Sequence, residues 1–174
     1  MTDERFVYLG NYGNLDSDSN SFPDMMIGRI SANSSQDASE MIDKIIDYDR
    51  NPDLGSWRNR VVVVADDNLH PPFTNRETDH TTQAETLANR HIPQSFEAGK
   101  IYMVEYPMGT GGEKPQARDA LMSAFNQGSL IINWIGHGSA GLWADEHIFR
   151  RIEDIPRLRN GKKLPLIVTA SCSI

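Results

Sequence analysis

The amino-acid sequence predicts an α/β fold with a mostly parallel sheet. Two runs, at residues 130–135 and 164–170, are short, apolar and rich in β-branched side chains. Such runs are typical of strands that are buried on both faces of a parallel sheet. Helical and strand-like stretches alternate along the later part of the chain, which is the order expected of α/β proteins.

The expected elements can be placed one by one. They are strands at 5–9 and 25–30, a helix at 36–48, a strand at 60–65, a helix at 82–90, a strand at 101–105, a helix at 115–126, and the two apolar strands. In the first helix, apolar residues recur at helical spacing, and Ser34 or Ser35 can cap its first turn. The third helix repeats that spacing and is expected to end at Gly128. The apolar faces are formed by Ala38, Met41, Ile42, Ile45 and Ile46 in the first helix and by Ala117, Ala120, Leu121, Ala124 and Phe125 in the third. We expect both faces to be core.

The length and composition of the chain exclude some classes of function. A chain of 174 residues can bury one sizeable core, so residues 1–174 are expected to form one domain or part of one. The net charge is −7 and the 17 basic residues are scattered, which argues against a nucleic-acid partner. No apolar stretch approaches the length of about 18 residues that predicts a transmembrane helix. The amino terminus also lacks the basic and apolar regions of a signal peptide.

Two polar residues follow the apolar strands. His137 comes after the first of them, between Gly136 and Gly138, and Cys172, the only cysteine, comes after the second. Loops at the carboxyl ends of parallel strands line the crevice where ligands bind. A thiol beside an imidazole is a nucleophile with its base, because a free cysteine with a pKa near 8.5 is mostly protonated at neutral pH. The alternative is structural: each residue taken alone is more often ordinary core.

The sequence resembles a known family. A strand followed by Gly-His-Gly, and later a strand followed by Ala-x-Cys, resembles the caspase-like cysteine peptidases. The stretch 136–139, with Trp143 downstream, is similar to the gingipain-like peptidases in particular. Residues 23–30, 41–48 and 75–80 are similar to that family's Asp-x-x-x-Gly-Arg strand, its Asp-Lys-Ile-Ile-x-Tyr helix and its acidic loop. The resemblance implies a caspase-like three-layer α/β/α sandwich, here truncated after the nucleophile strand.

The resemblance also implies catalytic roles. Cys172 would attack the peptide carbonyl and form a thioester, His137 would be its base and acid, and Glu77 would orient the imidazole. The amides of Gly138 and Cys172 would form the oxyanion hole.

The family resemblance implies two further residues that bind the substrate. Trp143 and Ser171 would contact the substrate, although a lone tryptophan is more often part of the core. Gingipains that cut after basic residues carry an acidic group in their pocket, and the matching stretch, residues 87–89, has none. Cleavage after basic residues is therefore in doubt.

The stretch 164–173 is most similar to the sortase-like peptidases of the type IX secretion system. That resemblance implies an exported protein at the bacterial outer membrane or cell surface, with a protein or peptide substrate and other type IX components as partners. Its reaction would remove carboxyl-terminal sorting domains from secreted cargo, by hydrolysis or by transfer to an amine. Because Ile174 lies two residues past Cys172, we expect residues 1–174 to be a fragment of a longer peptidase domain.

Two alternatives stay open: a gingipain-like secreted protease of other specificity, and a non-catalytic caspase-like binding or scaffold module of a surface secretion complex. The chemistry requires no cofactor. The family resemblance allows a structural calcium, but its ligands are open. Asp16-x-Asp18-x-Asn20 resembles the start of a calcium loop, yet Ser21 and Ile27 stand where an EF-hand needs glycine and glutamate.

Overall fold

The computed structural model describes residues 25–67 and 79–172, and the chain divides into two compact units, Met1–Arg50 and Asn51–Ile174. Helix α1 (Ser35–Arg50) belongs to the first unit. Its amino terminus is capped as expected, because the Ser34 hydroxyl accepts a hydrogen bond from the Asp37 N–H at 3.0 Å. The strand expected at 5–9 lies outside the described residues.

Two expectations for the first unit are wrong. Residues 25–30 form no strand, because no partner strand is described for their backbone groups. The apolar face of α1 is not core: Met41, Ile42, Ile45 and Ile46 are between 36% and 49% exposed. In the part of this unit that the structure describes, α1 is the one regular element, so no second helix or strand there covers this face.

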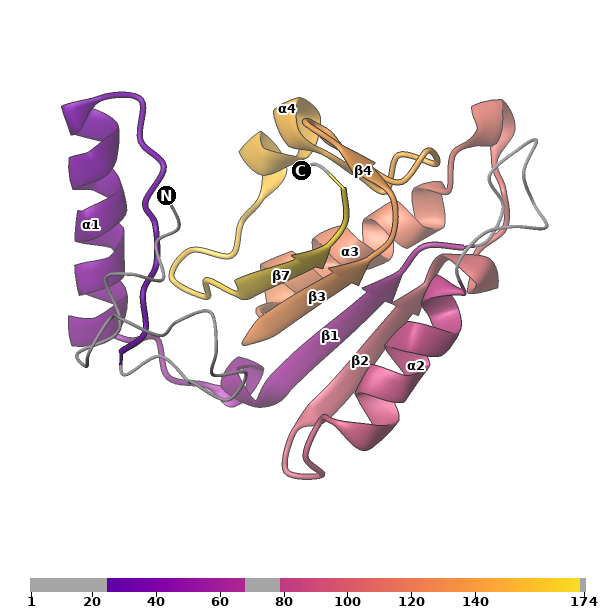
Figure 1. The fold of residues 1–174 in the computed structure, drawn as a ribbon, viewed down its shortest axis with the longest axis horizontal. Helices are drawn as coiled ribbons and strands as arrows, with labels where there is room; N and C mark the ends of the chain where they lie inside the picture. Colours follow the sequence, from indigo (N-terminus) through magenta and orange to yellow (C-terminus); the bar gives the residue numbers. More distant parts are fainter. Residues whose placement is uncertain (1–24, 68–78, 173–174) are drawn as a thin grey trace, which may run out of the picture. The chain divides into compact units, whose positions relative to one another are not determined.

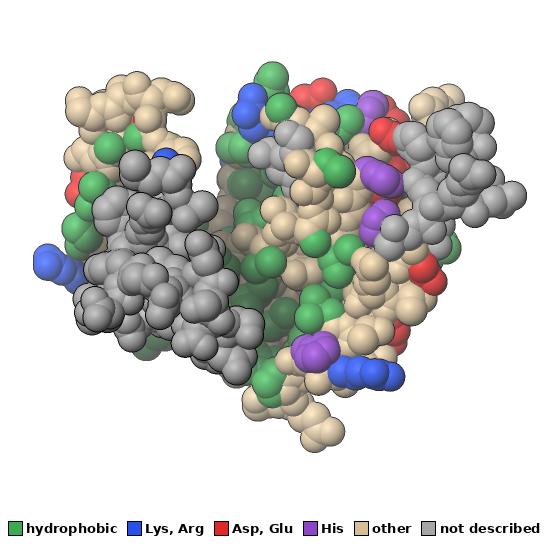
Figure 2. Space-filling model, viewed as in Figure 1, with side chains coloured by type: hydrophobic (Ala, Val, Ile, Leu, Met, Phe, Trp, Pro, Cys, Tyr) green, Lys and Arg blue, Asp and Glu red, His purple; other side chains and the backbone are tan. Residues whose placement is uncertain are grey.

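The second unit is built on a parallel sheet with the strand order β2-β1-β3-β7 (Figure 1). The strands are β1 (Arg60–Ala65), β2 (Glu97–Tyr102), β3 (Ile131–Ile135) and β7 (Leu166–Ala170). This arrangement confirms the predicted α/β fold with a mostly parallel sheet. The expectation that the 164–170 run is buried on both faces is wrong: in the sheet that the described residues form, β7 is an edge strand, and Leu166, Ile167 and Val168 are 62%, 44% and 42% exposed. Figure 2 shows apolar side chains at the surface in this region.

Two helices cover opposite faces of the sheet. On one face, Val62 and Val64 of β1 share a core cluster with Leu121 of α3 (Pro115–Gln127). On the other face, Val63 and Ala65 pack with Ala84 and Ala88 of α2 (His80–Arg90). Alternate residues of a strand point to opposite faces, so β1 is buried by both helices. The result is the expected three-layer α/β/α sandwich.

Several boundaries differ from those expected. Strand β2 begins four residues before the expected strand at 101–105, because β1 pairs with it in parallel from Arg60 opposite Glu97 to Ala65 opposite Tyr102. Its polar residues are those of an edge strand, whose outer side faces solvent. Helix α3 ends at Gly128 as predicted, with a φ of 94° that favours glycine. Within the described ranges, short 3₁₀ turns lie at Ser56–Asn59, Met103–Glu105, Thr110–Gly112 and Ile155–Arg157.

A small antiparallel sheet follows β3 and was not expected. It consists of β4 (Gly138–Ser139), β5 (Leu142–Trp143) and β6 (Phe149–Arg150), and the short helix α4 (Arg151–Asp154) comes next. The fully buried carboxylate of Asp154 accepts hydrogen bonds from the Arg118 guanidinium of α3. This ion pair ties the end of the small sheet to the sandwich.

None of the helices within the described ranges combines the length and the apolar composition needed to cross a membrane.

Replacing Leu121 tests the core. Its side chain is fully buried between α3 and the sheet, so Leu121→Ala leaves a cavity and is expected to lower the free energy of unfolding by about 2–5 kcal/mol. Urea unfolding measures the change. Gln116→Ala, at an exposed position of the same helix, is the control and should change stability by less than about 0.5 kcal/mol. Equal losses in the two variants would contradict this packing.

Candidate active site

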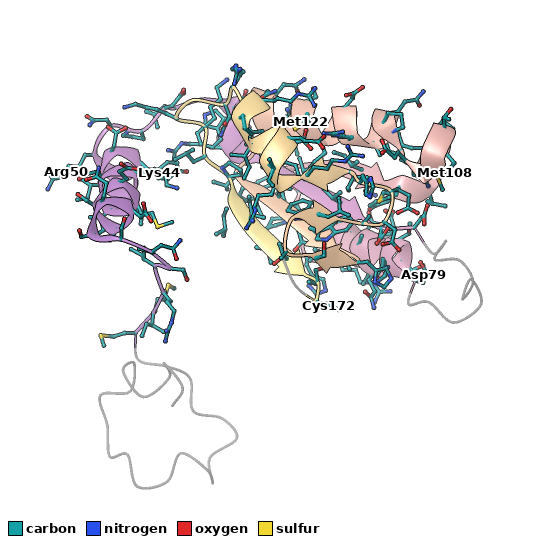
Figure 3. The ribbon with its side chains drawn as sticks, turned by 90° about the horizontal axis from the view of Figure 1, so that it is seen from above. Lys44, Arg50, Asp79, Met108, Met122 and Cys172 are labelled. Carbon is teal, nitrogen blue, oxygen red and sulfur yellow. The ribbon has the colours of Figure 1, made fainter. Side chains whose placement is uncertain are left out.

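The two predicted catalytic residues leave neighbouring strand ends. Strands β3 and β7 pair in parallel, with Ile135 opposite Ala170, and the Gly136 N–H continues the pairing by donating to the Ala170 carbonyl at 3.2 Å. His137 and Cys172 each lie two residues past that last pair. Because neighbouring strands run about 4.8 Å apart, both residues follow adjacent strands at the carboxyl end of the sheet. Cys172 is exposed and lies just beyond the end of β7 (Figure 3).

The backbone of His137 is held on both sides. Its N–H donates to Oδ2 of Asp66 at 2.8 Å, and its carbonyl accepts from the Ala144 N–H at 3.0 Å. Ala144 has a φ of 58°, which is uncommon for a residue with a side chain. Such strain is found where the surroundings fix a functional loop. The backbone of the loop after β3 is therefore hydrogen-bonded on both sides of the histidine.

Asp66 lies at the end of β1, next to β3. It is 2% exposed, and its own N–H donates to the Ile135 carbonyl at 3.0 Å. Burial raises the pKa of Asp66 to about 6, while the hydrogen bond from the His137 amide and the charge of His137 act in the opposite direction.

Gly136 allows this close approach. A Cβ atom there would lie 2.5 Å from the Asp66 Cβ and 2.6 Å from Cζ2 of Trp134. The first glycine of the Gly-His-Gly stretch is thus required by the packing of Asp66 and Trp134 against the loop.

A second histidine packs on the first. His80 opens α2, and its ring meets that of His137 edge to face, with the ring centres 5.2 Å apart. One ring nitrogen of each histidine and one carboxylate oxygen of Asp66 all lie within 4.8 Å of one another. The start of α2 is fixed by Asp79, which accepts a hydrogen bond from the Thr82 N–H at 2.8 Å. Figure 2 shows histidine and acidic side chains close together on the visible face.

Three buried carboxylates form a group next to the histidines, and Asp66 belongs to both sets. Oxygens of Asp66, Asp67 and Glu146 approach within 4.8 Å of one another. Asp67 forms a buried ion pair with Lys114, whose Nζ also donates to the Met103 carbonyl at 2.6 Å. Burial, followed by the charge of Asp67, raises the pKa of Glu146 to about 7.

These carboxylates do not fit the structural calcium that the family resemblance allows. The Lys114 ammonium already supplies a positive charge to the group, and a divalent cation would have to displace or approach it. We therefore assign no calcium to them.

The other predicted residues are spread around the site. Gly138 is half-buried in β4. Trp143 is 4% exposed and stacks on Trp134, with ring centres 5.5 Å apart, so its indole is part of the core. The hydroxyl of half-buried Ser171 has no hydrogen-bond partner among the residues that the structure describes. Glu77 lies outside those residues. The oxyanion role of Gly138 and Cys172, the substrate-binding roles of Trp143 and Ser171, and the role of Glu77 stay predictions.

Sequence reasoning missed Asp66 and His80. The signal for Asp66 was present, because two aspartates directly follow the run Val61–Ala65 at the carboxyl end of a buried strand. His80 lies in the stretch 75–80 that resembles the family's acidic loop, but its contact with the His137 ring depends on how α2 packs.

A parallel sheet covered on both faces, with a cysteine and a histidine after neighbouring strands, is the arrangement expected of the caspase-like cysteine peptidases. Residues 4–174 match the family model described as Peptidase family C25. The chain belongs to this family of cysteine peptidases.

Known relatives agree with this assignment. The chain is 28% identical to Gingipain R2 of Porphyromonas gingivalis over 152 residues, which are 87% of this chain and 19% of that protein. It is equally similar to Gingipain R1 of the same organism, where the match covers 14% of the relative. The crystal structure of the Arg specific cysteine proteinase gingipain R superimposes with a TM-score of 0.57 at 25% identity, covering 84% of this chain and 32% of that one. The chain thus spans a fifth or less of these curated relatives.

The buried carboxylate of Glu146 makes the free energy of unfolding depend on pH. Its pKa is about 7 in the folded protein and 4.5 ordinarily, so the folded state loses stability as pH rises from about 4.5 to about 7. Glu146→Gln removes this loss. The variant is expected to gain on the order of 1–3 kcal/mol relative to the parent between pH 5 and pH 8. Urea unfolding at both pH values measures the gain.

The control is Glu97→Gln, which replaces an exposed carboxylate of β2. Its effect on unfolding is expected to be the same at the two pH values. A pH-independent effect of Glu146→Gln would contradict the burial of this carboxylate.

Proposed function

We propose that the full-length protein is a cysteine endopeptidase in which His137 activates Cys172. The observation that carries the proposal is the pairing of β3 with β7, which brings both residues to one end of a sheet whose family consists of cysteine peptidases. A scaffold function has no such support among the described residues.

The reaction proceeds in two halves. His137 accepts the thiol proton, and the Cys172 thiolate attacks the peptide carbonyl, forming a C–S bond and an oxyanion. Backbone N–H groups, for which Gly138 and Cys172 are the candidates, stabilise that oxyanion. The imidazolium then protonates the leaving amine as the C–N bond breaks, and a thioester remains. Water attacks the thioester and yields a carboxylic acid, whereas an amine in its place yields a new amide.

The substrate class follows from the resemblance of residues 164–173 to PorU, the sortase-like peptidase of the type IX secretion system. We infer that the protein removes carboxyl-terminal sorting domains from secreted cargo, as an exported protein at the bacterial outer membrane or cell surface, with type IX components as partners. The solved relative is described as Arg specific. Residues 87–89 of this chain carry no carboxylate for such a side chain, which supports a different specificity. The proposal includes the structural calcium that the family resemblance implies.

Replacing the nucleophile tests the enzyme assignment. In the full-length protein, Cys172→Ala removes the only thiol of this sequence and is expected to abolish cleavage of cargo carrying a sorting domain. Cargo processing is measured by mass spectrometry of the released carboxyl-terminal peptide. Normal processing by the Cys172→Ala protein would refute the proposed activity.

Replacing the base tests the pairing. His137→Ala is expected to lower kcat by about 10²–10⁴-fold and to slow alkylation of Cys172 by iodoacetamide at pH 7. His91→Ala is the matched control, because His91 is exposed at the other end of α2. It should leave both rates unchanged. Unchanged alkylation in His137→Ala would show that the two residues are not a catalytic pair.

A further inference from the structure

We propose that Asp66, His80 and His137 form a binding site for Zn²⁺, and that the bound ion holds the peptidase inactive. The three residues come from three elements: the loop after β1, the start of α2 and the loop after β3. The inhibition rests on the proposed function, because the ion occupies the imidazole that serves as the base. The binding itself does not depend on that function.

The first step is the set of donor atoms. One carboxylate oxygen of Asp66 and one ring nitrogen each of His80 and His137 lie within 4.8 Å of one another. Ligands at about 2.0–2.1 Å from a tetrahedral zinc lie about 3.3 Å apart, so small side-chain rotations bring these atoms to bonding positions. Two imidazoles and one carboxylate form zinc sites that keep an open fourth position. The same set suits Ca²⁺ poorly, because Ca²⁺ takes oxygen ligands.

The second step is the capacity of the Asp66 carboxylate to accept another partner. An ionised carboxylate offers about four acceptor positions. Oδ2 of Asp66 accepts from the His137 N–H at 2.8 Å, and Oδ1 accepts from the Asp67 N–H at 3.0 Å. Each oxygen therefore has room for a metal bond as well. The two backbone hydrogen bonds orient the carboxylate, as outer hydrogen bonds do for the ligands of known metal sites.

The third step is the support of the two histidines. The His137 carbonyl accepts from the Ala144 N–H at 3.0 Å, and the first turn of α2, which His80 opens, is capped by Asp79. The two rings meet edge to face with their centres 5.2 Å apart. Both histidines are half-buried, so an ion can reach them from solvent. Ligands held in this way lose little conformational freedom when the ion binds.

The fourth step is the charge beside the site. Asp67 and Glu146 lie in one buried carboxylate group with Asp66, and the Lys114 ammonium is bonded to Asp67. Even when Glu146 is protonated, two carboxylates stand against one ammonium, and the remaining negative charge attracts a cation. Lys114 is paired with a residue that is not one of the three proposed ligands.

The test is zinc binding by the full-length Cys172→Ala protein, measured by calorimetry at about pH 7.5, where imidazoles are mostly neutral. A thiolate is itself a zinc ligand, and this substitution removes it. We expect Cys172→Ala to bind a Zn²⁺ ion whose affinity falls more than about 100-fold when His80→Ala is added, since loss of an outer partner alone costs about 10- to 100-fold. An excess of Ca²⁺ should not displace the ion.

The control adds His91→Ala in place of His80→Ala. His91 is exposed at the other end of α2, so this variant should keep the zinc affinity of Cys172→Ala. Zinc binding that is lost in Cys172→Ala, or that is unchanged by His80→Ala, would overturn the proposal. X-ray absorption at the zinc edge covers the case in which His80→Ala does not fold. Two imidazole ligands in Cys172→Ala with one equivalent of zinc support the site, and fewer than two overturn it.

The inhibitory role has its own measurement. Zn²⁺ should inhibit peptide cleavage by the parent protein with an inhibition constant equal to the Kd of the Cys172→Ala protein, and a chelator should restore the rate. Cleavage that continues when the site is saturated would overturn this role. Failure of the proposed function is distinguishable, because cargo would then be cleaved by the Cys172→Ala protein while its zinc binding stayed measurable.

Discussion

The candidate site depends on the burial of β3 between β1 and β7. The backbone of β3 pairs with both neighbours in parallel, so three adjacent strands end on the same side of the sheet. Each end supplies one residue of the site: Asp66 after β1, His137 after β3 and Cys172 after β7. A slip of one residue in either pairing would turn every side chain of a strand to the other face. The apolar contacts on both faces of the sheet therefore also determine which side chains lie next to one another at its carboxyl end.

One strand shows how nearly complete burial makes an element predictable. Strand β1 has the expected bounds, because a run of valines buried on two faces has few alternatives. Strand β2 was displaced, since the residues that pair with β1 include Glu97, Gly99 and Lys100, which carry no strand signal of their own. The small sheet β4-β5-β6 has strands of two residues each, and such strands exist only through their tertiary contacts.

Some residues of the candidate site could be predicted from the sequence, and others could not. Cys172 and His137 were predicted because each follows an apolar strand and matches a family pattern. Asp66 also follows a buried strand, yet its bond to the His137 amide depends on the register between β1 and β3. His80 depends on the packing of α2. The sequence therefore indicated His137 and Cys172, which follow recognisable apolar strands. It did not indicate Asp66 and His80, whose positions depend on contacts between elements.

The buried charges of the site are mostly negative. Asp66, Asp67 and Glu146 lie together, and Lys114 is the cation bonded to one of them. Crowding and burial favour the protonated form of Glu146 near neutral pH, which leaves Asp66 and the Lys114–Asp67 pair. The excess charge is then the negative charge of Asp66, directed at His137. In the proposed reaction, the proton that leaves the Cys172 thiol would move toward the side of the site that carries this negative charge.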